Sequence, residues 1–363
     1  MQNKVSPKVA MICNIPSPYR EQTHVILQSK LGSAYHVFYC AHTESNRLWN
    51  IKYGNYDKTF LKKSTFKIRN KAIYVNLDII KSLRRYNPDV VITAGFFPTM
   101  LLAYLWCKFN KKKHIVYTDG TLKSEAHLTF LHRLIRRIVY KGTHAFIGVS
   151  KKSLDLYKSY QIKPEKLFLS PYCADNQNLE KFRTTAKKYD VIFCGQLIDR
   201  KMPFFFINTI KLVNATRSCK VLLVGDGNLK AEVMRSLEEN KIDYHYPGFV
   251  QTEDLPPLFA SSKVFAFPTK YDAWGLVANE ACAFGIPVIT CDNAGAANEL
   301  IINGYNGYVL PLDENIWAEH IIKLISDPLL YEKLSTKAFD SVQPYNYEYA
   351  VEGVLNAVAF AKK

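Results

Sequence analysis

Two acidic residues eight positions apart flank a glycine that can begin a helix. Asp272 follows an apolar run, Gly275 comes shortly after it, and Glu280 lies among the apolar residues beyond. Amides at a helix start lack intrahelical partners and carry partial positive charge, so those of Gly275, Leu276 and Val277 could bind a phosphate group. The two carboxylates could then accept hydrogen bonds from sugar hydroxyls on either side. The structural alternative is a loop aspartate and an exposed glutamate.

A second segment with phosphate chemistry follows the apolar run 190–194. It begins with Gly195 and Gln196 and places Arg200 and Lys201 at the start of the next helical pattern. A lysine beside a helix N-terminus can add a full charge against a diphosphate. An ordinary strand-to-helix turn with a solvated lysine explains the same residues equally well.

A third turn, Gly225-Asp226-Gly227, also follows an apolar run and opens a helical pattern. Glycine there permits positive φ and a close approach of the backbone to a ligand. An ordinary tight turn with a capping Asp or Asn is the simpler explanation of this turn on its own.

Short β-branched and aromatic runs alternate with helical patterns along the whole chain, which is typical of parallel sheets covered by helices on both faces. The predicted strands are 9–15, 35–40, 89–93, 114–118, 145–149 and 167–170, then 190–194, 220–224, 264–268, 287–291 and 307–310. The predicted helices of the first half are 20–31, 77–85, 129–140 and 151–160. The basic stretch 52–71 is predicted to be a long irregular loop.

Two such series predict an α/β protein with two Rossmann-like, doubly wound domains. The expected divisions are an N-terminal domain 1–180, a C-terminal domain 181–342 and a terminal helical segment 343–363 that returns to the first domain. The polar stretch 174–189 has no strand pattern and is the expected linker.

The composition of the 363 residues excludes disordered and collagen-like classes, with 48% hydrophobic and 22% charged residues. Eight cysteines stand singly, without metal-site spacing, and favour a reducing cytoplasm. The apolar run near the N-terminus is too short for a signal peptide, and 96–107 is too short to span a bilayer. We therefore expect a cytoplasmic protein that is soluble or bound to a membrane from one side.

The segment 271–307 resembles the donor-binding region of the retaining glycosyltransferases of family 4, which have the GT-B fold of two domains facing a cleft. The motifs of that family are, in order along the chain, Glu-x7-Glu, then Ala-x-Ala-x-Gly-x-Pro-Val, then a Gly and a Glu, and then Asn-Gly. The matching residues are Asp272, Glu280, Ala281, Ala283, Gly285, Pro287, Val288, Gly295, Glu299, Asn306 and Gly307. The segments 195–201, 225–227 and 248–250 resemble further motifs of the same family.

The resemblance implies roles for the matching residues. Lys201 would hold the nucleotide diphosphate and stabilise the charge that develops on it as the glycosidic bond breaks. Glu280 would bind ribose hydroxyls, and Asp272 would bind the hydroxyls of the transferred sugar. The implied donor-binding set is Gly195, Gln196, Arg200, Lys201, Gly225, Gly248, Phe249, Asp272, Trp274, Gly275, Leu276, Val277 and Glu280. The sugar would keep its anomeric configuration, and no metal or other cofactor is expected.

The sequence departs from the family pattern at several places. Asp272 replaces the usual Glu, and Gln196 replaces the usual Arg. The first loop lacks the usual Gly-Gly pair and instead places Ser17, Tyr19 and Arg20 on the expected acceptor side. The family commonly has a His that faces the donor sugar, and Asp119 is the candidate for that position here. The predicted catalytic residues are therefore Asp119, Lys201 and Asp272. Asp119-Gly120 is also an ordinary turn signal.

The net positive charge of the chain comes entirely from the first half. Residues 1–180 hold 29 basic and 11 acidic residues, whereas the net charge of the chain is +16. The predicted helix 129–140 alternates Arg133, Arg136 and Arg137 with apolar residues. A basic amphipathic helix can bind anionic lipid headgroups, so this helix predicts an enzyme on the inner face of the cell membrane. An equally good alternative is that the basic face of the helix is solvated and its apolar face packs on the protein core.

The predicted activity is transfer of a hexose-type sugar from a nucleotide-diphosphate sugar to a glycan or lipid-linked acceptor. A UDP-sugar is favoured and a GDP-sugar is possible, and the setting would be synthesis of cell-surface polysaccharide or lipopolysaccharide. A nucleotide-sugar epimerase on the same fold is the alternative. A nucleic-acid-binding role is not predicted, because it leaves Asp272 and Glu280 unexplained and no nucleic-acid module pattern is present.

Overall fold

The computed structural model describes residues 6–44, 47–62, 65–68 and 71–363, without the side chains of 65–68, 71 and 72. The chain divides into two compact units. The first comprises Met1–Tyr172 and Tyr347–Lys363, and the second comprises Cys173–Asn346. The division falls before the polar stretch 174–189, whereas the sequence analysis placed it after residue 180. Because residues 174–189 have no strand pattern, their sequence does not show where the first unit ends and the second begins.

The first unit is built on a seven-stranded, fully parallel sheet. Its order is β3 (Lys58–Phe60), β2 (Tyr35–Tyr39), β1 (Val9–Cys13), β6 (Val90–Thr93), β7 (Lys113–Thr118), β8 (Ala145–Gly148) and β9 (Leu167–Leu169). The central strands are buried on both faces, which explains their nearly continuous apolar sequences.

The basic stretch 52–71 is not the irregular loop that the sequence predicted. It contains the edge strand β3, the strand β4 (Thr65–Ile68) and the start of β5 (Lys71–Tyr74), which pairs with β4 in an antiparallel ribbon. These strands are only three or four residues long and rich in lysine, so their alternation is too weak to detect. The basic side chains at 63, 67, 69 and 71 lie outside the described residues.

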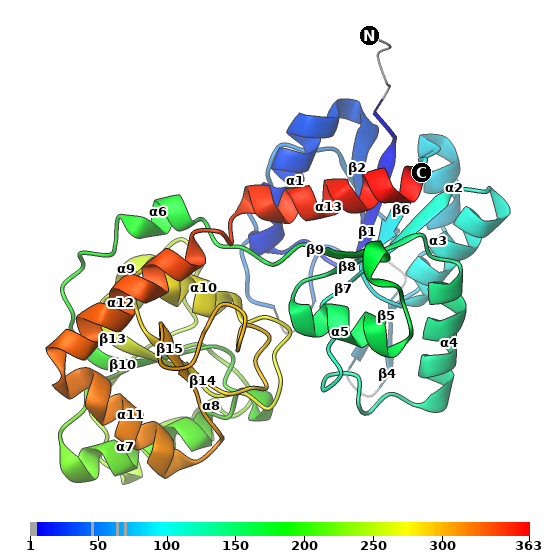
Figure 1. Cartoon of the computed structure of the whole chain (residues 1–363). Helices are drawn as coiled ribbons and strands as arrows, with labels where there is room; N and C mark the ends of the chain where they lie inside the picture. Colours follow the sequence, from blue (N-terminus) through cyan, green and yellow to red (C-terminus); the bar gives the residue numbers. More distant parts are fainter. Residues whose placement is uncertain (1–5, 45–46, 63–64, 69–70) are drawn as a thin grey trace. The chain divides into compact units, whose positions relative to one another are not determined.

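Helices cover both faces of this sheet (Figure 1). They are α1 (Pro18–Leu31), α2 (Ile79–Tyr86), α3 (Pro98–Phe109), α4 (Phe130–Lys141), α5 (Lys151–Ser159) and α13 (Tyr347–Lys362). The C-terminal helix α13 packs on α1 and on β7, β8 and β9, and the Ser170 hydroxyl donates to the Ala350 carbonyl at 2.8 Å. The last residues of the chain therefore complete the core of the first unit.

The second unit has a six-stranded parallel sheet. Its order is β12 (Tyr244–Gly248), β11 (Val221–Val224), β10 (Tyr189–Cys194), β13 (Ser262–Phe267), β14 (Val288–Thr290) and β15 (Gly307–Val309). Its helices are α6 (Asn176–Glu180), α7 (Pro203–Thr216), α8 (Lys230–Glu239), α9 (Leu255–Ala260), α10 (Leu276–Ala283), α11 (Glu314–Ser326) and α12 (Pro328–Val342). The strand order reverses between β10 and β13, and ligands of such sheets bind at the carboxyl ends of the strands at this point.

Two further findings bear on the environment of the protein. All eight cysteines are buried thiols without a disulfide. Among the helices of the described residues, none combines the length and the hydropathy that crossing a membrane demands.

Candidate functional site

The residues predicted to bind the donor gather at the carboxyl edge of the six-stranded sheet. Gly195 follows β10, Gly225 follows β11, and Gly248 ends β12. The Gly195 amide donates to the Val224 carbonyl at 3.0 Å, and the Gly225 amide donates to the Gly248 carbonyl at 2.9 Å. A side chain at position 225, where φ is +138°, would overlap the Gly195 carbonyl oxygen. Glycine is therefore required where these turns lie against each other.

A partly buried ion-pair cluster joins two of the predicted segments. The Lys201 Nζ lies 2.6 Å from the Asp272 Oδ2, and the Arg200 Nη1 lies 3.1 Å from the same oxygen. Burial acts to raise the pKa of Asp272, but the charges and hydrogen bonds of Lys201 and Arg200 together lower that pKa below its ordinary value. Asp272 is thus ionised and holds both cations at the sheet edge. An ammonium has three donors, so Lys201 can bind Asp272 and a phosphate together.

Glu280 lies just past the first turn of α10 and is half-buried. Its carboxylate has no hydrogen bond or ion pair with any residue that the structure describes. Burial raises the pKa of Glu280 to about 7. Burial also raises the pKa of the Cys194 thiol; the Glu280 charge adds to that shift and the Lys201 charge opposes it, so both charges lie near the end of β10. A buried carboxylate without a protein partner is well suited to accept ligand hydroxyls.

The start of α10 offers free amides at the same edge. Gly275 caps the helix at φ +94°, and a side chain there would meet the Phe267 ring, whose Cζ would lie 2.8 Å from the new Cβ. Within the described part of the chain, the amides of Gly275, Leu276 and Val277 donate to no acceptor. Free amides and the helix dipole together favour an anion at this position.

Trp274 does not fit its predicted contact with the donor. Its side chain has no exposed surface, and its Nε1 donates to the Asn279 Oδ1 at 2.7 Å. Its backbone amide donates to the Asp272 Oδ1 at 3.3 Å. Trp274 therefore positions the loop from within the core. Gln196 and Phe249 are half-buried on the loops after β10 and β12, and their roles stay predictions.

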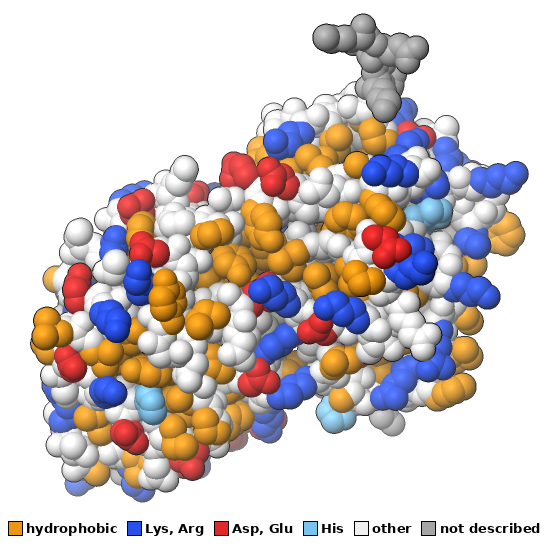
Figure 2. Space-filling model, in the orientation of Figure 1, with side chains coloured by type: hydrophobic (Ala, Val, Ile, Leu, Met, Phe, Trp, Pro, Cys, Tyr) orange, Lys and Arg blue, Asp and Glu red, His pale blue; other side chains and the backbone are white. Residues whose placement is uncertain are grey.

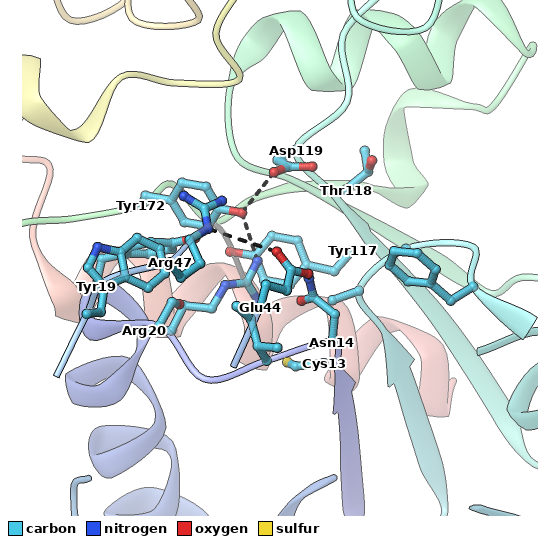
Figure 3. A pocket seen from close by; sticks show the side chains of 16 residues that line it. Cys13, Asn14, Tyr19, Arg20, Glu44, Arg47, Tyr117, Thr118, Asp119 and Tyr172 are labelled. Carbon is cyan, nitrogen blue, oxygen red and sulfur yellow. Dashed lines mark hydrogen bonds and ion pairs between the residues drawn. The ribbon is translucent and has the colours of Figure 1, made fainter. Parts of the chain in front are cut away.

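In the first unit, a pocket of about 240 Å³ opens at the carboxyl ends of β1, β6 and β7 (Figure 3). Ser17, Tyr19 and Arg20 at the start of α1 line it, together with Asp119 from the loop after β7. Tyr172 connects two of them, since its hydroxyl accepts from the Arg20 Nη2 at 3.0 Å and donates to the Asp119 Oδ2 at 3.3 Å. The structure thus brings the predicted acceptor-side residues and Asp119 into one pocket.

Other residues of this pocket were not predicted from the sequence. Glu44, Arg47 and Trp49 come from the segment between β2 and β3, and Tyr117 and Tyr172 come from or follow strands. No motif or periodicity marks Glu44, Arg47 or Trp49, because only the parallel arrangement of the strands brings these segments to one edge.

The three arginines of α4 are not equivalent, which corrects the prediction for one of them. The Arg136 Nη2 lies 2.7 Å from the Glu125 Oε1, and its guanidinium carbon lies 4.3 Å from the centre of the Phe96 ring. Arg136 is buried, so it holds the helix to the unit and is unable to face a membrane. Arg133 and Arg137 are exposed.

Exposed apolar residues accompany the exposed arginines of α4. Phe130, Leu131 and Ile138 are 76%, 62% and 57% exposed. Figure 2 shows Lys and Arg side chains interspersed with hydrophobic ones over the part of the first unit where Figure 1 places α4. The apolar residues of this helix are thus divided between the core and the surface.

Comparison with known proteins connects both units to one enzyme class. The model of Glycosyltransferase Family 4 matches residues 29–177, and that of Glycosyl transferases group 1 matches residues 175–341. An uncharacterised 41.2 kDa protein of the Klebsiella pneumoniae cps region is 25% identical over 66% of this chain and 69% of its own length. The Escherichia coli O-antigen chain mannosyltransferase B is 30% identical, but over only 31% of this chain and 29% of its own length.

The fold agrees with this assignment. The solved structure of Anabaena HepE in complex with UDP and glucose matches with a TM-score of 0.74 at 14% identity, covering 97% of this chain and 99% of that one. Together the two family models cover residues 29–341. The chain belongs to the family 4, group 1 glycosyltransferases and has the α/β GT-B fold.

Proposed function

We propose that the protein transfers a hexose-type sugar from a nucleotide-diphosphate sugar to a glycan or lipid-linked acceptor, with retention of anomeric configuration. A UDP-sugar is the favoured donor and a GDP-sugar the second choice. UDP and glucose occupy the structurally similar HepE, and the related mannosyltransferase acts on an O-antigen chain. These relatives support a place in the synthesis of cell-surface polysaccharide or lipopolysaccharide.

One observation carries the proposal: an unpaired Glu280 carboxylate, the cations of Lys201 and Arg200 and free helix amides all lie at the carboxyl edge of one sheet. A diphosphate needs cations and amide donors, and a ribose needs a hydroxyl-accepting carboxylate beside it. A structural role leaves Glu280 unexplained, because a desolvated carboxylate without a partner is costly.

The reaction follows from these parts. The bond between the anomeric carbon and the β-phosphate oxygen breaks, and Lys201 with the α10 amides stabilises the charge that develops on the diphosphate. The acceptor hydroxyl bonds to the anomeric carbon from the face that the phosphate leaves, and its proton passes to a leaving phosphate oxygen. Lys201 and Arg200 supply the positive charge at the diphosphate, so we propose a reaction without a metal or other cofactor. Asp119 is the candidate in the first unit for binding a sugar hydroxyl.

We further propose that the enzyme is peripheral on the inner face of the cell membrane. The exposed Leu131 and Ile138 together with Arg133 and Arg137 support this location, since apolar side chains can enter the headgroup region while the cations meet anionic lipids.

A panel of UDP- and GDP-sugars tests the donor half directly. We expect one of them to raise the melting temperature of the protein. The same nucleotide sugar should be slowly hydrolysed, with release of the nucleotide. NMR of a glycoside product should show a retained anomeric configuration. Lys201→Ala and Glu280→Gln should weaken both signals strongly, whereas Glu239→Gln, an exposed glutamate on α8, preserves them. Donor epimerisation without transfer favours the epimerase. If no nucleotide sugar binds, or the two site variants behave as wild type does, the proposed function is wrong.

A further inference from the structure

We propose that the pocket of the first unit binds an acidic sugar, with Arg20 and Arg47 holding its anionic group. The inference rests on the proposed function for the role of this sugar as acceptor, and it names the acceptor class. The ligand chemistry is a sugar ring bearing a carboxylate, as in a uronic acid, or a phosphate.

Arg20 is the first cation of the pocket. Its guanidinium carbon lies 4.5 Å from the centre of the Tyr117 ring and 5.0 Å from that of Tyr172. The Nη2 donates to the Tyr172 hydroxyl, but the buried Nη1 has no partner among the described residues. A guanidinium carries five N–H donors in a planar fork that matches a carboxylate or a phosphate.

The place of Arg20 along the chain supports a ligand role. It lies in the first turn of α1, where the helix dipole disfavours a cation. A residue that opposes a local preference and keeps buried donors unpaired is expected at a functional site.

Arg47 is the second cation. Its guanidinium carbon lies 4.6 Å from the centre of the Trp49 ring. The Arg47 Nε forms an ion pair with the Glu44 Oε2 at 4.0 Å. This distance is too long for a hydrogen bond, and the buried Nε has no hydrogen-bond partner among the described residues. Two arginines from different segments thus line the same pocket (Figure 3). Each has one buried N–H donor that makes no hydrogen bond with the described residues.

The two carboxylates of the pocket already have partners. The Glu44 Oε1 accepts from the Tyr74 hydroxyl at 2.8 Å and from the Asn14 Nδ2 at 3.3 Å. Asp119 accepts from the Tyr172 hydroxyl. Glu44 is therefore held as part of the wall, and the second oxygen of Asp119 can accept a sugar hydroxyl.

Aromatic rings form another wall. The Tyr19 ring centre lies 4.7 Å from that of Tyr172 and 6.0 Å from that of Trp49. Such faces bind the apolar side of a sugar ring, while polar groups fix its orientation. Cations, a hydroxyl acceptor and aromatic faces together fit an acidic sugar better than a neutral one.

Direct binding to the full-length protein, measured by calorimetry at pH 7.5, tests the proposal without the need for turnover. The probes are methyl glucuronide, glucose 6-phosphate and neutral methyl glucoside. We expect at least one acidic probe to bind about 10- to 100-fold more tightly than the glucoside, as hydrogen bonds to charged groups imply. The two acidic probes distinguish a carboxylate from a phosphate.

Arg47→Gln should remove most of this preference, and Arg20→Lys should reduce it. Arg85→Gln, an exposed arginine on α2, should leave it unchanged. Arg47 is the decisive position if Arg20 variants fail to fold. Equal binding of charged and neutral probes, or a preference that survives in Arg47→Gln, overturns the proposal. Nucleotide-sugar binding is measured separately, so loss of donor binding alone contradicts the proposed function and leaves the ligand class of this pocket standing.

Discussion

The Asp272 Oδ2 lies 2.6 Å from the Lys201 Nζ, although 71 positions separate the two residues. Both side chains are largely buried, at 14% and 11% exposure. The contact orients the ammonium before any ligand arrives, and preorganised charge is the most effective kind in a transition state. Asp272, the residue that the family pattern assigns to the sugar, thus also positions Lys201, the lysine that we propose binds the diphosphate.

Lys201→Ala should lower kcat about 10²- to 10³-fold, because the charge opposite the leaving diphosphate is lost. The melting temperature should also fall, since Arg200 is the one ion-pair partner that Asp272 keeps among the described residues. Product formation and thermal unfolding are the measurements. Lys270→Ala is the matched control: Lys270 forms an exposed ion pair with Asp199, and its loss should change either quantity little. Equal behaviour of the two variants would contradict the role of Lys201.

Glu280 should make donor binding depend on pH. The pKa of Glu280 in the folded protein is about 7, so its carboxyl is mostly protonated below that pH. The carboxylate, which accepts hydrogen bonds from hydroxyls, is then largely absent. The KM for the nucleotide sugar should therefore rise as pH falls from 8 to 6. In Glu280→Gln the KM should be higher throughout and nearly flat with pH, whereas Glu239→Gln should keep the wild-type profile. If the KM of wild type and that of Glu280→Gln depend on pH in the same way, Glu280 does not bind the donor.

The same group should affect the stability of the ligand-free protein. Because the folded-state pKa of Glu280 is raised, its contribution to stability is present below about pH 4.5 and is lost as pH rises through 7. Glu280→Gln lacks the ionisable group, so at pH 8 it should be more stable than wild type by on the order of 2 kcal/mol. Denaturant unfolding at pH 5 and pH 8 measures this, and a stabilisation that is equal at both pH values would count against it.

Gly275→Ala should weaken both stability and donor affinity. Alanine is strained at φ +94°, and its Cβ would press on the Phe267 ring, which displaces the start of α10. Gly304→Ala is the control, since its φ is +72° but no atom lies within 4 Å of the new Cβ. We expect a loss of about 1–2 kcal/mol for the control and more for Gly275→Ala, measured by denaturant unfolding. Unchanged UDP-sugar binding in a folded Gly275→Ala protein would argue against the α10 amides as ligands.

The exposed surface of α4 should bind anionic membranes. Flotation with vesicles containing an anionic lipid should recover the wild-type protein at low salt and less of it at high salt. Replacing Leu131 and Ile138 with Ser, or Arg133 and Arg137 with Gln, should reduce recovery without unfolding the protein, because these side chains are exposed. Lys30→Gln with Arg85→Gln, exposed on α1 and α2, controls for loss of positive charge. Recovery that is equal for neutral and anionic vesicles would contradict the proposal.

The local pattern of the chain was enough to predict much of the fold. The apolar runs at 9–15, 190–194 and 264–268 correspond to β1, β10 and β13, because strands buried on both faces need nearly continuous apolar sequence. The short strands β3, β4, β5 and β12 were missed. β3 and β12 lie at sheet edges, and β4 and β5 form a separate two-stranded ribbon, so none of them has the continuous apolar sequence of a central strand.

The sequence by itself determined the parallel α/β architecture and the enzyme family, and it pointed to the proposed donor segment around Asp272 and Glu280, because all three reside in short contiguous patterns. Only the tertiary structure decided which charges are paired. It joined Lys201 to Asp272, left Glu280 without a partner, and buried Arg136 against Glu125. It also assembled the pocket of Arg20 and Arg47. Pairing and burial depend on which strands become neighbours, and that is settled by packing between segments far apart in the chain rather than by residue type.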